Sequence, residues 1–155
     1  MDFLKTLKTA GYTARIKRIS DGIMHDSRKI YKEIDLDIEP NWHLVFLLLK
    51  ERDKMTVTEI SEALGFSHPA VIKIIKKMKL RGYLYSEVDK KDSRKQQISL
   101  SKKALNKLPD FEEEWKKMVV VLNTIFDKEI ATLLDKLEDK LQERGLFESY
   151  KNYIQ

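Results

Sequence analysis

The chain has 155 residues, of which 42% are hydrophobic and 35% charged, and a net charge of +5, enough for one folded domain with a hydrophobic core. The absence of cysteine excludes disulfides and thiolate metal sites, and five glycines with three prolines are too few for a sandwich of many short strands. The longest apolar run, Leu44–Leu49, is far shorter than a membrane span of about 20 residues, and the N-terminus carries no cleavable apolar segment, so we expect a cytoplasmic location.

The first third of the chain predicts helices. A short helix should begin at Asp2. Isoleucines at spacings of three, four and seven predict an amphipathic helix over Thr13–Ile34. A loop at Asp35–Glu39 follows, and Pro40 suits the first turn of a helix that ends near Arg52. The apolar run in this helix predicts burial nearly all round.

The next segment, TVTEISEALGFSHPAVIKIIKKMKLRG, predicts two short helices separated by a glycine turn. We expect Thr58 to cap the first helix and Gly65 to end it. Ser67 should cap the second, and Pro69 falls in its first turn, where the missing N–H costs nothing. Gly82 should end the second helix. The segment therefore predicts a helix-turn-helix.

A hairpin and two longer helices are predicted to complete the chain. Tyr83–Val88 and Gln96–Leu100 have the β-branched and aromatic content of strands, and the polar loop DKKDSRK joins them. Ser101 should cap a helix that reaches about Phe126. Asp127–Arg144 predicts a further amphipathic helix, and LFESYKNYI adds an apolar last turn.

The positive charge is concentrated in one part of the chain. Residues 67–107 hold twelve Lys and Arg against three acids, a net of +9. Residues 1–66 hold eleven of each, a net of zero, and residues 108–155 hold seven bases against eleven acids, a net of −4. On an ordinary solvated surface rich in lysine, the positive charge would be spread evenly along the chain. The partition therefore favours binding of a polyanion through the second helix and the hairpin.

The second helix of the motif has an apolar side and a cationic side. At about 100° per residue, one stripe holds Val71, Ile75 and Met78. The opposite side holds Lys73, Lys76 and Lys77, which we expect to contact phosphates. The residues expected nearest the bases are Ser67, His68 and Ala70.

The hairpin loop gathers four cations around one carboxylate. The cations are Lys90, Lys91, Arg94 and Lys95. Asp92 can hold the side chain of Arg94 or cap the turn, which leaves a cation aimed outward. A cation at a hairpin tip can enter a narrow minor groove of DNA, where the potential is most negative.

Three of these patterns resemble a known family. They are TEISEALGFS, the recognition-helix ending MKLRGYL and DKKDSRKQQISLS, whose Asp92 and Arg94 resemble a wing. Together they are similar to the winged helix-turn-helix of the MarR family of bacterial transcription regulators. The sequence departs from that family at Ser86, where an Arg is frequent, at Lys90, where a Pro is common, and at Ala104, where a Gly is usual.

The resemblance implies a mainly α-helical fold with a two- or three-stranded β-wing and long terminal dimerisation helices. It implies one MarR-like domain over 1–155, with the DNA-binding lobe at 40–107 and helical dimerisation regions at 1–39 and 108–155. It also implies a homodimer on an inverted-repeat operator in double-stranded DNA, without a membrane partner. We expect a repressor that a small-molecule effector releases from its operator.

Two further sets of residues are candidates for an effector pocket and a dimer interface. The aromatic and Met residues of the first set could line a pocket or simply form core: Met24, Tyr31, Trp42, Phe46, Trp115 and Met118. The second set exceeds what the terminal helices need for themselves: Phe3, Leu4, Leu7, Leu133, Leu137, Leu141, Leu146, Phe147 and Tyr150.

Other classes of function have weaker support in the sequence. The three histidines, His25, His43 and His68, lack metal-ligand spacing, and the nearest pairing is His43 with Glu39, so we expect neither a metal nor a cofactor. The sequence contains no nucleophile elbow, phosphate loop or dinucleotide fingerprint, so we expect no enzyme. The alternative is a winged-helix protein-interaction or adaptor dimer that does not read DNA specifically.

Overall fold

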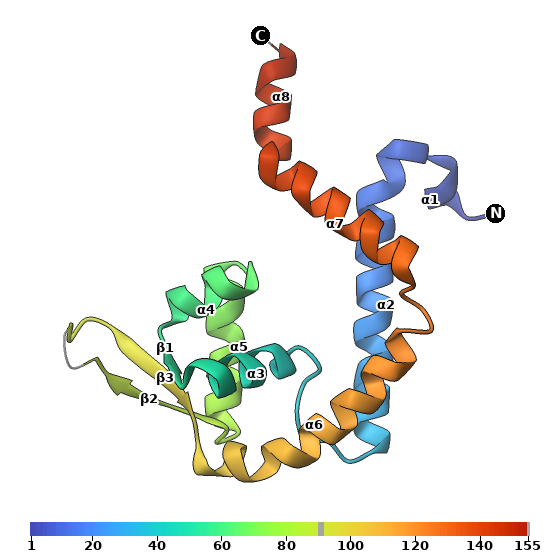
Figure 1. Ribbon diagram of the computed structural model, residues 1–155. Helices are drawn as coiled ribbons and strands as arrows, with labels where there is room; N and C mark the ends of the chain where they lie inside the picture. The colour runs from blue at the N-terminus through green and yellow to red at the C-terminus, as the bar shows by residue number, and fades with distance from the viewer. Residues whose placement is uncertain (90–91, 155) are drawn as a thin grey trace. The chain divides into compact units, whose positions relative to one another are not determined.

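The computed structural model describes residues 1–89 and 92–154. They fall into two compact units, Met1–Pro109 and Asp110–Gln155. Helices make up most of both units, as predicted, and the N-terminal unit also holds a small sheet (Figure 1). This unit contains both the helix-turn-helix and the hairpin, so it carries the features that point to function.

The N-terminal unit begins with two short helical segments and one long helix. They are α1 (Phe3–Thr6), the 3-10 helix η1 (Lys8–Gly11) and α2 (Tyr12–Glu33). Asp2 caps α1, as predicted, and also accepts two hydrogen bonds of 2.8 and 3.1 Å from the guanidinium of Arg18. The same carboxylate therefore fixes α1 against the second turn of α2.

Helix α3 (Trp42–Arg52) begins two residues after the predicted start at Pro40. Three residues of its apolar run are fully buried: Val45, Phe46 and Leu49. Leu47 is 42% exposed, so the prediction of burial nearly all round is wrong on that side. Val45, Phe46 and Leu49 thus form the core side of α3, and Leu47 lies outside it.

Helix α4 (Val57–Leu64) begins with a capping box at Thr56, not at the predicted Thr58. Thr56 Oγ1 accepts from the backbone N–H of Glu59 at 3.2 Å, and the Glu59 carboxylate accepts from the backbone N–H of Thr56 at 2.7 Å. Thr58 sits inside the helix, where its hydroxyl cannot reach these groups. Gly65 ends the helix with φ of 64°, a left-handed conformation that favours glycine.

Helix α5 (His68–Leu80) is the second helix of the motif. Ser67 precedes it in an extended conformation, and Pro69 lies in its first turn, as predicted. Gly82, with φ of 73°, ends the helix and redirects the chain into the hairpin.

In the described part of the chain, three strands form one antiparallel sheet in the order β1-β3-β2. They are β1 (Lys54–Met55), β2 (Leu84–Val88) and β3 (Gln96–Leu100). The hairpin pairs Leu84 with Leu100, and β1 pairs with the other edge of β3. The sheet thus joins the start of α4 to the hairpin that follows α5.

Tyr83 forms the centre of the core in this unit. Its ring is fully buried and meets the rings of Trp42 and Phe46 edge-on, with centroids 6.1 and 5.4 Å apart. Its hydroxyl donates to the backbone carbonyl of Asp37 at 3.4 Å, and the ammonium of Lys103 lies 4.2 Å from the ring centroid. Burial raises the pKa of the Tyr83 phenol above its ordinary value. The end of α5 is therefore anchored to both α3 and the loop before it.

Three helices follow the hairpin: α6 (Lys102–Leu122), α7 (Lys128–Glu143) and α8 (Leu146–Ile154). Ser101 caps α6 by accepting from the backbone N–H of Ala104 at 3.1 Å, and Asp127 caps α7 in the same way. The Ser101 cap is as predicted, and the Asp127 cap agrees with the predicted start of the next helix. The C-terminal unit begins at Asp110, inside α6.

Candidate nucleic-acid interface

The buried side of α5 fixes which of its residues face solvent. Val71, Ile75 and Met78 are buried as predicted, and Ile74 joins them. The three lysines predicted on the opposite side are all exposed: Lys73, Lys76 and Lys77. The helix therefore presents a cationic front while its back packs in the core.

The first turn of α5 is open to solvent. Ser67, His68 and Ala70, predicted to lie nearest the bases, are all exposed. The backbone of Ser67 occupies the cap position, but its hydroxyl makes no capping hydrogen bond. Its O–H is therefore available to a partner outside the helix. Ile72 is also 46% exposed on this front, which helical spacing alone did not single out.

Two aspartates build the turn of the hairpin. Asp89 Oδ1 accepts from the backbone N–H of Asp92 at 2.9 Å, and Asp89 Oδ2 accepts from the side-chain amide of Gln97 at 2.7 Å. The backbones of Asp89, Asp92 and Lys95 are further joined by two hydrogen bonds of 2.9 Å. Lys90 and Lys91, predicted to contact DNA, lie outside the described residues.

Asp92 also orients Arg94, as predicted. Its Oδ1 accepts from both the backbone N–H and the Nε–H of Arg94, each at 3.1 Å. These hydrogen bonds hold the pKa of the Asp92 carboxyl below its ordinary value, and the one from the Arg94 side chain has the larger effect. The Arg94 side chain is 90% exposed against 29% for Asp92, so the cation projects from the turn. Lys95 is exposed beside it.

The hairpin is joined to the rest of the lobe by polar contacts. Lys79 Nζ at the end of α5 donates to Ser86 Oγ on β2 at 2.7 Å. Lys54 on β1 pairs with Glu87 on β2 across the sheet. The wing and the recognition helix are therefore held as one surface, with Lys73, Lys76 and Arg94 exposed on it.

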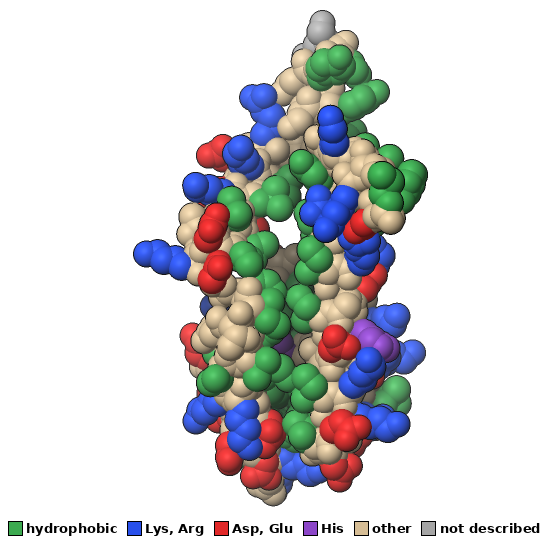
Figure 2. All heavy atoms as spheres, turned by 90° about the vertical axis from the view of Figure 1, so that its right-hand side faces the viewer, with side chains coloured by type: hydrophobic (Ala, Val, Ile, Leu, Met, Phe, Trp, Pro, Cys, Tyr) green, Lys and Arg blue, Asp and Glu red, His purple; other side chains and the backbone are tan. Residues whose placement is uncertain are grey.

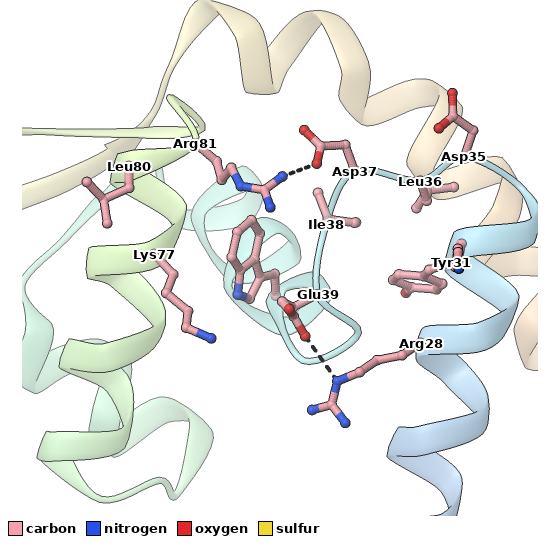
Figure 3. A pocket seen from close by; sticks show the side chains of 12 residues that line it. Arg28, Tyr31, Asp35, Leu36, Asp37, Ile38, Glu39, Lys77, Leu80 and Arg81 are labelled. Atoms are coloured by element: carbon pink, nitrogen blue, oxygen red, sulfur yellow. Dashed lines mark hydrogen bonds and ion pairs between the residues drawn. The ribbon is translucent and has the colours of Figure 1, made fainter.

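A pocket of about 620 Å³ lies between α2, α5 and the loop that connects α2 to α3. Figure 3 shows Lys77 reaching from α5 and Arg28 from α2 toward the space between the two helices. Two ion pairs border it: Arg28 with Glu39 at 3.2 Å and Arg81 with Asp37. The loop is thereby fixed to α2 on one side and to the end of α5 on the other.

The predicted effector residues are only partly brought together by this pocket. Tyr31 and Trp42 line it. Phe46 instead is fully buried against Tyr83 in the core. Met24 is half-buried on α2, and two residues belong to the C-terminal unit, Trp115 and Met118. The pocket residues that sequence reasoning missed come from α2, from the connecting loop and from the end of α5, and most are charged.

The predicted dimerisation residues are exposed apolar side chains in both units. Phe3 is 71% exposed, while Leu4 is half-buried. The others are exposed as well: Leu7, Leu133, Leu137, Leu141, Leu146, Phe147 and Tyr150. Figure 2 shows hydrophobic side chains of α8 standing out at the top of the view. Both units therefore carry exposed apolar side chains at the positions predicted for dimerisation.

The histidines do not gather into a metal site. His43 Nδ1 lies 2.6 Å from the carbonyl oxygen of Pro40, and Glu39 is paired with Arg28. Among the described residues, no three His, Asp or Glu side chains could together hold a metal ion. Nor is any helix in the described ranges long and apolar enough to cross a membrane.

Comparison with known proteins identifies the fold. Residues 36–95 match a family model described as "MarR family". No curated protein is a significant match. A structure of reduced AbfR bound to DNA is similar at a TM-score of 0.72 and 20% identity, covering 92% of this chain and 98% of that one.

Two further solved structures share the fold. A complex of S. aureus MepR with DNA has a TM-score of 0.66 and 18% identity, over 85% of this chain and 96% of that one. The transcriptional regulator SlyA has a TM-score of 0.65 and 15% identity, over 93% and 99%. The predicted mainly helical winged helix-turn-helix is confirmed, with a three-stranded wing and helices at both termini.

Proposed function

We propose that this chain, which carries a MarR family segment at residues 36–95, binds double-stranded DNA sequence-specifically and regulates transcription. One observation carries the proposal. The exposed lysines of α5 and the exposed Arg94 lie on two elements, the helix and the hairpin, that the hydrogen bond from Lys79 to Ser86 connects. The similar structures of AbfR and MepR are complexes with DNA, which supports it. This function requires a location with the DNA, which we take to be the cytoplasm.

In the proposed complex, α5 enters the major groove with its N-terminal turn foremost. Ser67, His68 and Ala70 then meet base edges, and the lysines pair with phosphates on the groove walls. Arg94, held by Asp92, reaches the neighbouring minor groove, where a cation gains most from the potential. Lys90, Lys91 and Lys95 add phosphate contacts around it.

The active species in this proposal is a homodimer. The exposed apolar side chains of α7 and α8 in one unit, and those of α1 in the other, are surfaces that a second copy would bury. Two-fold symmetry then places two recognition helices about 34 Å apart, one DNA turn, so the operator is an inverted repeat. Sedimentation of Leu137→Asp tests this: it should be monomeric, whereas Lys136→Asp on the same helix should stay dimeric.

We further propose that the protein is a repressor which a small molecule releases from its operator. The pocket of about 620 Å³ supports this, because Lys77 and Arg81 of the recognition-helix segment line it together with the loop at Asp37. A ligand there would change contacts that hold the end of α5. Compounds that raise the melting temperature should also weaken operator binding; stabilising compounds that leave binding unchanged would contradict this proposal.

Selection from random duplexes tests the DNA-binding proposal itself. The full-length protein should enrich an inverted repeat with half-site centres about 10 base pairs apart. A variant with Lys73, Lys76 and Arg94 changed to Ala should enrich nothing. Recovery of unrelated sequences with equal affinity would instead favour the protein-interaction dimer, which shares the fold but not the readout.

A further inference from the structure

The exposed front of α5 is poor in groups that read bases by hydrogen bonds. The pairings with the best geometry are Arg with guanine, Asn or Gln with adenine, and Asp or Glu with cytosine. The segment from Ser67 to Leu80 contains none of these five residue types. Ser67 and His68 can hydrogen-bond only at the tip of the helix. In the middle of the helix only lysines could read a base by hydrogen bonds, and their partner would be guanine, so discrimination of A·T pairs there needs another kind of contact.

Apolar side chains occupy the positions where such readers would stand. Ala70 and Ile72 flank Lys73 around the helix axis, at about 60° on one side and 100° on the other. Ala70 is exposed, and Ile72 is 46% exposed although its neighbours Val71, Ile74 and Ile75 are buried. Ile72 is the fifth residue of α5 and so lies in the half of the helix that approaches bases.

The surroundings of Ile72 place it beside cations. Lys76 follows one turn later on the same side of α5, and both residues border a largely apolar depression between α5 and the wing strand β3. Ile72 lies about 40° around the helix axis from Lys76, on the side away from Lys73. A phosphate contact by Lys76 would therefore bring the Ile72 side chain to the floor of the groove next to that contact. Only one group on that floor is apolar, the 5-methyl group of thymine.

We propose that Ile72 reads a thymine methyl group in each half-site of the operator. This inference rests on the proposed function and adds to it the class of base that α5 recognises. Burying one methyl-sized group in an apolar contact corresponds to about a fourfold change in affinity. Readout of this kind distinguishes thymine from cytosine and from uracil, but it leaves the salt dependence of binding unchanged.

Deoxyuridine substitution isolates the methyl group without changing base pairing. In the operator obtained by selection, each thymine is replaced singly by deoxyuridine, and the dissociation constant is measured at fixed salt. With the natural sequence of the protein, one thymine per half-site should show about a fourfold loss. With Ile72→Ala, the loss at that same position should disappear. At this position 5-methylcytosine should bind better than cytosine.

Leu47→Ala is the matched control, because Leu47 is 42% exposed on α3. It should keep the full deoxyuridine effect, and circular dichroism should show both variants folded. If every deoxyuridine operator binds within twofold of the thymine operator, or if the loss persists in Ile72→Ala, the inference is wrong while the proposed function stands. If selection enriches no duplex, the proposed function itself fails.

Discussion

Lys79 on the recognition helix donates a hydrogen bond of 2.7 Å to Ser86 on the second strand of the sheet. The contact connects the two parts of the lobe that carry exposed cations. Ser86 is one of three positions named above at which the sequence departs from the family that it resembles, where an Arg is frequent. In this protein the position therefore holds a serine that accepts a hydrogen bond from Lys79, and not a positively charged side chain.

A double-mutant cycle on Lys79 and Ser86 measures this connection. Ser86→Ala and Lys79→Met should each lower the free energy of unfolding by about 1 kcal/mol, because each removes one partner of a partly buried hydrogen bond. The double variant should lose less than the sum of the two, since the second change removes nothing further. Strict additivity in urea denaturation would show that the contact contributes nothing in solution.

Arg94→Ala should weaken operator binding by about 1–3 kcal/mol, because it removes the oriented cation at the tip of the wing. Fluorescence anisotropy with the selected operator measures the change. Arg144→Ala, in an exposed position at the end of α7, serves as the control and should bind as before. An unchanged isotherm for Arg94→Ala would mean that the wing makes no contact of consequence.

Thr56→Ala should destabilise the protein by about 1 kcal/mol, the usual cost of losing a side-chain cap. Thr58→Ala is the matched control, since Thr58 is exposed inside the same helix, and it should change stability by less than about 0.5 kcal/mol. Thermal or chemical denaturation gives both values. A larger loss of stability in Thr58→Ala than in Thr56→Ala would mean that Thr58, and not Thr56, caps the helix.

The capping box should also make stability depend on pH. Hydrogen bonds from Thr56 lower the pKa of Glu59 below its ordinary value of 4.5, and the one from the backbone N–H has the largest effect. A carboxylate whose folded-state pKa is lowered stabilises the fold above its unfolded-state pKa and loses that contribution as pH falls through the lower value. Glu59→Gln should therefore lose less stability than the natural sequence between about pH 5 and pH 3. If both proteins lose the same amount of stability over this pH range, Glu59 does not have this role.

Much of the fold could be predicted because local signals and the tertiary structure agree. Ser101 caps its helix as predicted, the next helix begins at the predicted Asp127, and the buried stripe of α5 follows from its spacing. The wing turn followed from Asp92 and Arg94. The position of the third strand could not be predicted from local patterns, because β1 has two residues and Ser99, the partner of Lys54, lies 45 positions along the chain.

The start of α4 and the pocket show where local patterns mislead. Thr56 and Thr58 are both good caps, and only Thr56 stands three residues before Glu59, as a capping box requires. Aromatic residues at helical spacing predict Phe46 as a pocket residue, although it packs against Tyr83 in the core. Charged residues of an irregular loop, such as Asp37 and Glu39, carry no periodic signal.

The most direct test of the account is the salt dependence of DNA binding by the full-length protein. Each phosphate neutralised by a Lys or Arg contributes about −0.9 to the slope of log affinity against log salt concentration. With Lys73, Lys76 and Lys77 of two subunits on six phosphates, the slope should be about −5, and phosphate contacts by Lys90, Lys91 and Lys95 would make it steeper. A steep slope of this order on the selected operator is the predicted result. A slope near zero would contradict the assignment of this surface to DNA.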